Sequence, residues 1–141
     1  MRVLVTDGNE RAALAVTRAL GREAIEVIVG AETQRSLASA SRYCRESVSY
    51  PSPYQDPQGF VNALLDVVRK QRVDALFPVS DIAMHVIGPE KTRFAGYTHI
   101  PTPDAGCPAH DHVVVVLESL RTQLLDGVQL VEDLLGNSNA R

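Results

Sequence analysis

Polar residues that follow two short apolar runs are the positions where this sequence could bind a small molecule. The runs are RVLVT near the N-terminus and ALFPV in mid-chain, and the residues that follow them are Asp7, Gly8, Asn9, Ser80 and Asp81. The carboxyl ends of parallel strands meet at one edge of a sheet, where the N–H groups of the first turn and helix attract anions. Asp81 could hydrogen-bond a ligand amine or hydroxyl there, or simply cap the next helix. We therefore expect any site to lie near residues 6–10.

A second group of candidate binding residues occupies the cationic, hydroxyl-rich stretch between residues 31 and 46. It contains three arginines and three serines, which are Arg35, Arg42, Arg45, Ser36, Ser39 and Ser41. Guanidinium groups form forked, charge-assisted hydrogen bonds to phosphate or carboxylate, so this stretch could hold an anion near the carboxyl edge of the sheet. The alternative is a solvated connector, because loops are usually polar without being sites.

The first thirty residues position the first turn, because they predict a strand, a helix and a second strand. Residues 2–6 are apolar and β-branched and end at Asp7-Gly8, a turn dipeptide whose glycine can adopt backbone angles that other residues avoid. Asn9 is the predicted N-cap of a helix whose apolar residues recur on one face. Residues 25–30 restore the strand pattern, which predicts a right-handed βαβ unit.

The chain repeats this alternation up to about residue 103. Three further strands are predicted, at residues 47–51, 74–80 and 98–103. Pro78 predicts a bulge or the end of its strand, because proline cannot donate to the ladder. Helices are predicted after Asp56 and after Ser80 or Asp81, either of which can be the N-cap. This pattern predicts an α/β fold, an open, mostly parallel, doubly wound (Rossmann-like) sheet of about five strands with helices on both faces, plus a C-terminal helix.

Composition restricts the class of protein. The chain has 141 residues, of which 45% are hydrophobic, and this suits one soluble domain with an appendage. A formal net charge of −3 gives no reason to expect nucleic acid as a partner. No apolar run approaches the roughly 20 residues that span a bilayer, and no signal peptide is recognisable, so we expect a cytoplasmic protein with no membrane partner. Cys44 and Cys107 are too few for a disulfide framework.

The order of several segments resembles a known family. These segments are VLVTDGNERAALAVTRALGR, EVIVGAE, RSLASASRYC, SYPSPY, FVNALLDVV and DALFPVSD. Together they resemble the N-terminal, pre-ATP-grasp domain of carbamoyl-phosphate-synthase-like ATP-dependent ligases, over roughly residues 1–105. In such enzymes this domain helps to shape the substrate cleft. The resemblance implies substrate- or nucleotide-binding positions at Asp7, Gly8, Asn9, Ser41, Arg42, Ser80 and Asp81.

The resemblance also implies that this chain is not catalytic alone. The family's ATP-grasp module holds ATP and Mg²⁺ with a lysine-bearing strand, a glycine-rich flap and late acidic residues, none of which is recognisable here. Residues 106–141 are too few for a second domain, so the chain is expected to be either a truncated form or a stand-alone domain. We expect no cofactor in this chain itself. The expected partners are a small-molecule ligand and either a missing ATP-grasp domain or a second copy of the chain.

The C-terminal stretch has a pattern of its own. Apolar residues recur there at steps of three and four, which predicts a helix from His112 to Leu135. Gly127 weakens this helix and could divide it into two. The helix either packs across the domain itself or pairs with a second copy of the chain, as a dimerisation element.

Other chemistries lack their sequence signatures. A dinucleotide fingerprint needs three glycines in the first turn, which has only Gly8, although Glu32 occupies the position of a ribose-binding acid. The P-loop pattern is absent, and the group Cys107, His110 and His112 is one ligand short of a structural zinc site.

Two alternatives to a ligase domain remain. One is a stand-alone small-ligand or nucleotide-binding module that dimerises through the C-terminal helix, and the more remote one is an NAD-dependent enzyme.

Overall fold

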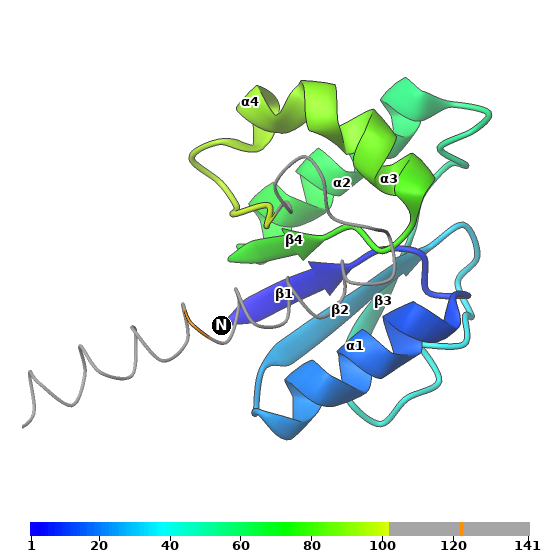
Figure 1. Ribbon diagram of the computed structural model, residues 1–141, viewed down its shortest axis with the longest axis vertical. Coiled ribbons are helices and arrows are strands. Elements are labelled where there is room, and N and C mark those ends of the chain that lie inside the picture. Colours follow the sequence, from blue (N-terminus) through cyan, green and yellow to red (C-terminus); the bar gives the residue numbers. More distant parts are fainter. Residues whose placement is uncertain (102–121, 123–141) are drawn as a thin grey trace, which may run out of the picture. The chain divides into compact units, whose positions relative to one another are not determined.

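A four-stranded parallel sheet forms the centre of the part of the chain that the computed structural model describes, which is residues 1–101 and residue 122. The strands are β1 (Arg2–Val5), β2 (Glu26–Ala31), β3 (Cys44–Ser49) and β4 (Ala75–Phe77), and their spatial order is β3-β2-β1-β4 (Figure 1). All three pairings are parallel. The predicted open, Rossmann-like α/β sheet is therefore confirmed.

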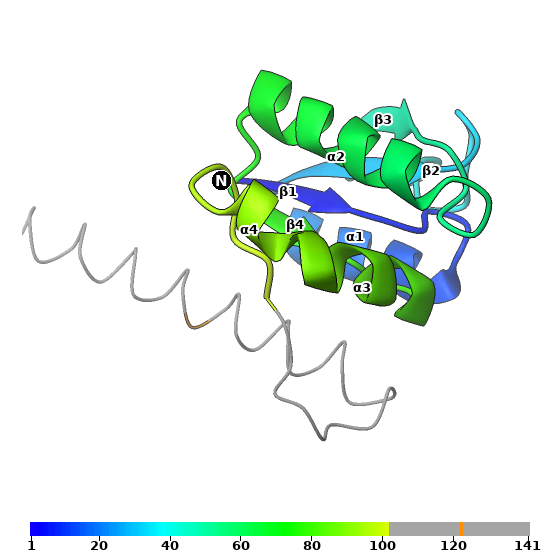
Figure 2. The ribbon, with the colours of Figure 1, turned by 90° about the horizontal axis from the view of Figure 1, so that it is seen from above.

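Helices cover both faces of the sheet, as predicted. They are α1 (Arg11–Arg22), α2 (Pro57–Gln71), α3 (Asp81–Ile87) and α4 (Lys91–Phe94), with the 3-10 turn η1 (Gly88–Glu90) between the last two. Seen from above, the sheet lies between α1 and α2 (Figure 2). The main hydrophobic core includes residues from β1, β2, β4 and three of the helices, among them Leu4, Ile28, Phe60, Leu76, Ile87 and Phe94.

The start of α1 differs from the prediction. Glu10 is the N-cap residue, and its side chain forms no capping hydrogen bond. The backbone turns at Asp7, where φ is 58°, and the Glu10 N–H donates to the Asp7 carbonyl at 2.8 Å. The Asn9 side-chain oxygen instead accepts a hydrogen bond from the Leu37 N–H at 3.4 Å. The predicted Asn9 cap is wrong, because this tight turn uses one more residue before the helix begins.

The third strand is placed earlier than predicted, at Cys44–Ser49 rather than 47–51. It is an edge strand that pairs only with β2, and its residues are half-buried or exposed. An edge strand tolerates charged residues such as Arg45 and Glu46, which give no apolar alternation. The alternation pattern therefore detects only the second half of this strand.

The predicted start of α2 is confirmed, and so is the predicted strand end at Pro78, although β4 is shorter than the predicted range of residues 74–80. The Asp56 carboxylate accepts a hydrogen bond from the Gly59 N–H at 2.9 Å, and Pro57 is the first residue of α2. The strand β4 ends at Phe77, directly before Pro78. A proline has no N–H for the ladder, so this strand is only three residues long.

The predicted fifth strand at 98–103 is reduced, as far as the structure describes it, to one parallel bridge between Ala75 and His99. Residues 102 and 103 lie outside the described residues, and so does the predicted helix from His112 to Leu135 apart from Thr122.

Residues Met1–Ile100 form one compact unit. In that unit and at residue 122, no helix combines the length and the apolar character needed to cross a membrane.

Candidate functional site

Two side chains, Thr6 and Asp7, join the carboxyl ends of β1 and β4. The Asp7 carboxylate accepts hydrogen bonds from the Ser80 N–H at 3.0 Å and from the Thr6 hydroxyl at 2.5 Å. The Thr6 hydroxyl oxygen in turn accepts a hydrogen bond from the Val79 N–H at 3.1 Å. The structure thus brings together the first turn and the end of β4, as expected for neighbouring parallel strands.

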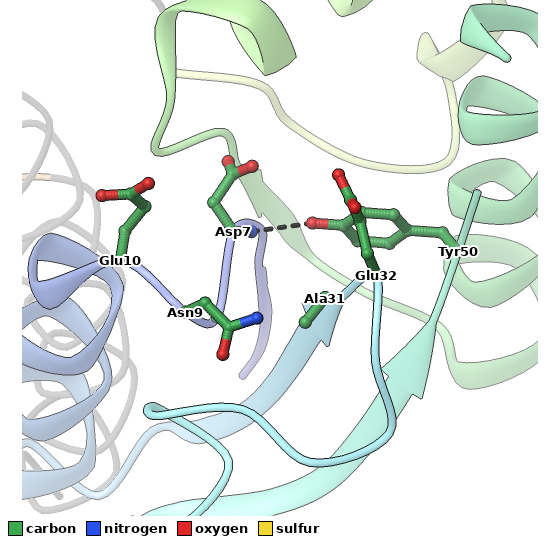
Figure 3. A pocket seen from close by; sticks show the side chains of 7 residues that line it. Asp7, Asn9, Glu10, Ala31, Glu32 and Tyr50 are labelled. Atoms are coloured by element: carbon green, nitrogen blue, oxygen red, sulfur yellow. Dashed lines mark hydrogen bonds between the residues drawn. The ribbon is translucent and has the colours of Figure 1, made fainter. Parts of the chain in front are cut away.

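Tyr50 is a third part of this edge and was not among the predicted site residues. Its hydroxyl accepts a hydrogen bond from the Asp7 N–H at 2.8 Å (Figure 3). The same hydroxyl donates to the Gly30 carbonyl at 3.3 Å. Its ring packs edge-on against Phe60, with the ring centroids 4.8 Å apart. Burial, together with the charge of Asp7, raises the pKa of the Tyr50 phenol well above its ordinary value. The sequence signal was an aromatic residue at the end of a predicted strand, directly before Pro51.

A hollow of about 200 Å³ opens beside this network. It is lined by the first turn, the end of β2 and Tyr50, that is by Asp7, Gly8, Asn9, Glu10, Ala31, Glu32 and Tyr50 (Figure 3). Small-molecule pockets usually have a volume of at least about 300 Å³. This hollow is smaller than that.

The charge of this hollow is negative, whereas a helix N-terminus predicts a site for an anion. Three of its lining residues are acidic, namely Asp7, Glu10 and Glu32. The N–H groups of Gly8 and Glu10 already donate to the carbonyls of Gly30 and Asp7, at 3.0 and 2.8 Å. Negative side chains repel an anion and attract a cation. The hollow therefore suits an amine or a hydroxyl group.

Gly8 lies at a position where a side chain has no room. A Cβ atom there would overlap Ser36 Oγ and lie 2.7 Å from Val29 Cγ1. The Gly8 carbonyl also accepts a hydrogen bond from the Ala38 N–H at 2.8 Å, which attaches the turn at residues 36–39 to the site. The positive φ of the first turn falls on Asp7, whereas the dipeptide suggested the glycine.

Ser80 and Asp81 have mainly structural surroundings. The Ser80 hydroxyl accepts a hydrogen bond from the Ala83 N–H at 3.2 Å and is the N-cap of α3, which settles the choice between the two predicted caps. Asp81 is the exposed first residue of α3, where its negative charge favours the helix N-terminus. It is not among the residues that line the acidic hollow.

Ser41 and Arg42 lie at the opposite edge of the sheet. They precede Cys44, the first residue of β3, so they are at the amino ends of the strands. Arg45, one residue further, pairs there with Glu26, the first residue of β2, at 3.4 Å. The predicted place of Arg42 and Arg45 near the carboxyl edge is wrong, because β3 begins between them, at Cys44. Ser41 and Arg42 border a separate hollow of about 380 Å³.

Metal-ligating groups give no further site in residues 1–101. No cluster of three or more His, Cys, Asp or Glu side chains in the described part of the chain could hold a metal ion. Cys107, His110 and His112 lie outside that part.

Burial raises the pKa of the half-buried Cys44 thiol, which keeps this residue in its unreactive, protonated form at neutral pH.

The fold and this edge define a class, a Rossmann-like α/β domain with an acidic hollow at the carboxyl ends of its strands. The solved structure of glycinamide-RNase-transformylase T from Mycobacterium tuberculosis is similar to it, with a TM-score of 0.53 and 20% sequence identity. The similarity covers 71% of this chain and 28% of that chain, so this chain spans less than a third of the neighbour's length. At this identity the similarity shows the fold alone. No protein-family model and no curated protein matches the sequence.

Proposed function

We propose that this chain is the N-terminal, substrate-cleft domain of an ATP-grasp-type, carbamoyl-phosphate-synthase-like ligase, and that it is not catalytic alone. The observation that carries the proposal is the network of Asp7, Tyr50 and Ser80, which fixes the first turn against the end of β4 beside the acidic hollow. The order of the sequence segments supports it. The structural neighbour, a glycinamide-RNase-transformylase T, supports it at the level of the fold.

The acidic hollow defines what this domain contributes to such an enzyme. The carboxylates of Asp7, Glu10 and Glu32 attract an amine or accept hydrogen bonds from hydroxyls, and so orient that part of the substrate. They do not fit the phosphates of ATP, because three negative charges repel a polyphosphate. ATP and Mg²⁺ therefore belong to the ATP-grasp domain of a longer protein. That domain would supply the phosphoryl chemistry.

A titration followed by nuclear magnetic resonance tests this proposal on the full 141-residue chain. The probe is glycinamide, the amine-bearing group in the neighbour's name, against Mg-ATP and NAD. Glycinamide should shift the amide signals of residues 7–10 and 32, and Glu32→Gln should weaken that effect. Glu23→Gln, an exposed site at the C-terminus of α1 with the same charge change, should leave it unaltered.

Two outcomes contradict the ligase-domain proposal. ATP turnover by the purified chain would refute it, because the proposal assigns that reaction to a separate ATP-grasp domain. Saturable NAD binding with hydride transfer would favour the dehydrogenase alternative. Sedimentation tests the stand-alone module, since a dimer that is lost on deletion of residues 112–135 would favour it and a strictly monomeric chain would discard it.

A further inference from the structure

The second hollow, of about 380 Å³, lies between the C-terminal half of α1 and the segment that enters β3. Its lining residues are Arg18, Arg22, Ala40, Ser41, Arg42 and Tyr43. Three of these six side chains are guanidinium groups and none is a carboxylate. The hollow is therefore strongly positive, although the whole chain carries a formal net charge of −3.

Tyr43 organises the cations of this hollow. Its ring lies directly on Gly21 of α1, where a Cβ atom would overlap the ring carbons. The Arg42 guanidinium donates to the Tyr43 hydroxyl at 2.8 Å, and the guanidinium carbon lies 4.8 Å from the ring centroid. A hydrogen bond from Arg42, assisted by Arg22, lowers the pKa of the Tyr43 phenol. The Arg42 guanidinium thus lies against both the ring and the hydroxyl of Tyr43, and Arg22 borders the same hollow.

A carboxylate close to this hollow is already paired. An adjoining hollow shares Arg42 and Tyr43 with it and contains one carboxylate, that of Glu26. Glu26 pairs with Arg2 at 2.7 Å and with Arg45 at 3.4 Å. Within residues 1–101, Arg18, Arg22 and Arg42 form no ion pair of their own. Their charge is therefore available to an external anion.

We propose that this hollow binds the phosphate group of a small molecule. Guanidinium groups match phosphate oxygens with forked, charge-assisted hydrogen bonds, and the hydroxyls of Ser41 and Tyr43 are further polar partners at the wall. The volume is within the usual range for small ligands, which begins at about 300 Å³. Nucleic acid is the poorer candidate, because it calls for an extended basic stripe and this is one hollow on an acidic protein. The site is independent of the acidic hollow at the opposite edge of the sheet.

The test is a titration of the full chain with inorganic phosphate and with phenyl phosphate at constant ionic strength, followed by nuclear magnetic resonance. Saturable shifts should be confined to Arg18, Arg22 and residues 40–43. Arg22→Ala should weaken binding about tenfold, the loss expected for one charge-assisted hydrogen bond. Arg11→Ala, at the other end of α1, removes the same charge and should leave binding unchanged.

The two probes separate the sources of the phosphate. Tighter binding of phenyl phosphate would assign the hollow to a phosphate monoester, and equal binding would assign it to the phosphate group itself. If Arg22→Ala proves unfolded by circular dichroism, Arg18→Ala replaces it, because Arg18 is exposed and borders the same hollow. Equal losses in Arg22→Ala and Arg11→Ala, shifts at arginines throughout the protein, or no binding of either probe at millimolar concentration would overturn the proposal.

Discussion

The carboxylate of Asp7 accepts a hydrogen bond from the backbone N–H of Ser80 at 3.0 Å, across 73 positions of sequence. This bond joins the turn after β1 to the N-cap of α3. Asp7 makes it from a left-handed backbone conformation, with φ at 58°, which aspartate and asparagine tolerate better than other side chains that carry a Cβ atom. An aspartate at position 7 therefore meets two requirements. It tolerates the positive φ, and its carboxylate accepts hydrogen bonds from the Thr6 hydroxyl and the Ser80 N–H.

Replacement of Asp7 measures this double requirement. Asp7→Ala removes the acceptor of two hydrogen bonds and leaves a positive φ, so the free energy of unfolding should fall by about 2–3 kcal/mol. Asp7→Asn keeps an acceptor oxygen and tolerates the backbone, and it should cost less than half as much. Asp81→Ala is the control, at an exposed carboxylate nearby, and should cost about 0.5 kcal/mol. Urea unfolding followed by circular dichroism measures all three, and equal losses in Asp7→Ala and Asp81→Ala would contradict the argument.

Tyr50→Phe tests the hydrogen bond that holds the first turn from the other side. The ring and its contact with Phe60 remain, but the Asp7 N–H loses its partner. A loss of about 1–2 kcal/mol is expected for the unpaired donor, together with faster hydrogen exchange at the Asp7 amide. An Asp7 amide that exchanges as slowly in the variant as in the parent chain would argue against this role.

The pH dependence of stability gives a second test of Tyr50. Burial raises the folded-state pKa of this phenol above its unfolded value near 10, so its contribution to stability is fully present below that pH. The contribution is lost as the pH rises from there towards the folded-state pKa. Tyr50→Phe has no phenol to titrate, so its stability should fall less steeply in this alkaline range. Parallel alkaline profiles of the two chains, measured by urea unfolding, would disprove the assignment.

Much of this fold could be predicted because its signals are local. The initial βαβ unit follows from a short apolar run and from apolar residues that recur on one helix face. The start of α2 follows from Asp56, and the end of β4 follows from Pro78. Each of these residues acts on its immediate neighbours in sequence. The meeting of Asp7 and Ser80 was also predictable, because parallel strands place their carboxyl ends at one edge.

The rest depends on contacts between distant residues. Tyr50 joins the site through a hydrogen bond to a residue 43 positions away, which no spacing pattern reveals. Arg42 was assigned to the wrong edge because β3 is a polar edge strand whose start carries no apolar alternation. Three acidic residues line one hollow at the first turn only because β2 places Glu32 beside that turn.

Gly8→Ala tests how closely the first turn is packed. The added methyl group would overlap Ser36 Oγ and lie 2.7 Å from Val29 Cγ1, so the free energy of unfolding should fall by about 1–3 kcal/mol. Gly88→Ala is the matched control, since no atom lies within 4 Å of a Cβ there and its φ of −50° is helical. That substitution should be neutral or should stabilise by about 0.4–1 kcal/mol. A similar loss in both variants would show that close packing at Gly8 is not the cause.

Gly21→Ala should displace Tyr43 and so disperse the cations of the positive hollow. The phenol pKa lies below its ordinary value, chiefly because the Arg42 guanidinium donates to its oxygen, with a smaller contribution from Arg22. A methyl group on residue 21 would occupy the place of the ring, so the Tyr43 pKa should return towards 10 in the variant. The carbon signal next to the phenol oxygen reports this titration in nuclear magnetic resonance. Phosphate bound to the parent chain should also raise the Tyr43 pKa, because a nearby anion disfavours the phenolate. A Tyr43 pKa that responds to neither change would separate this phenol from the arginines and remove it from the binding site.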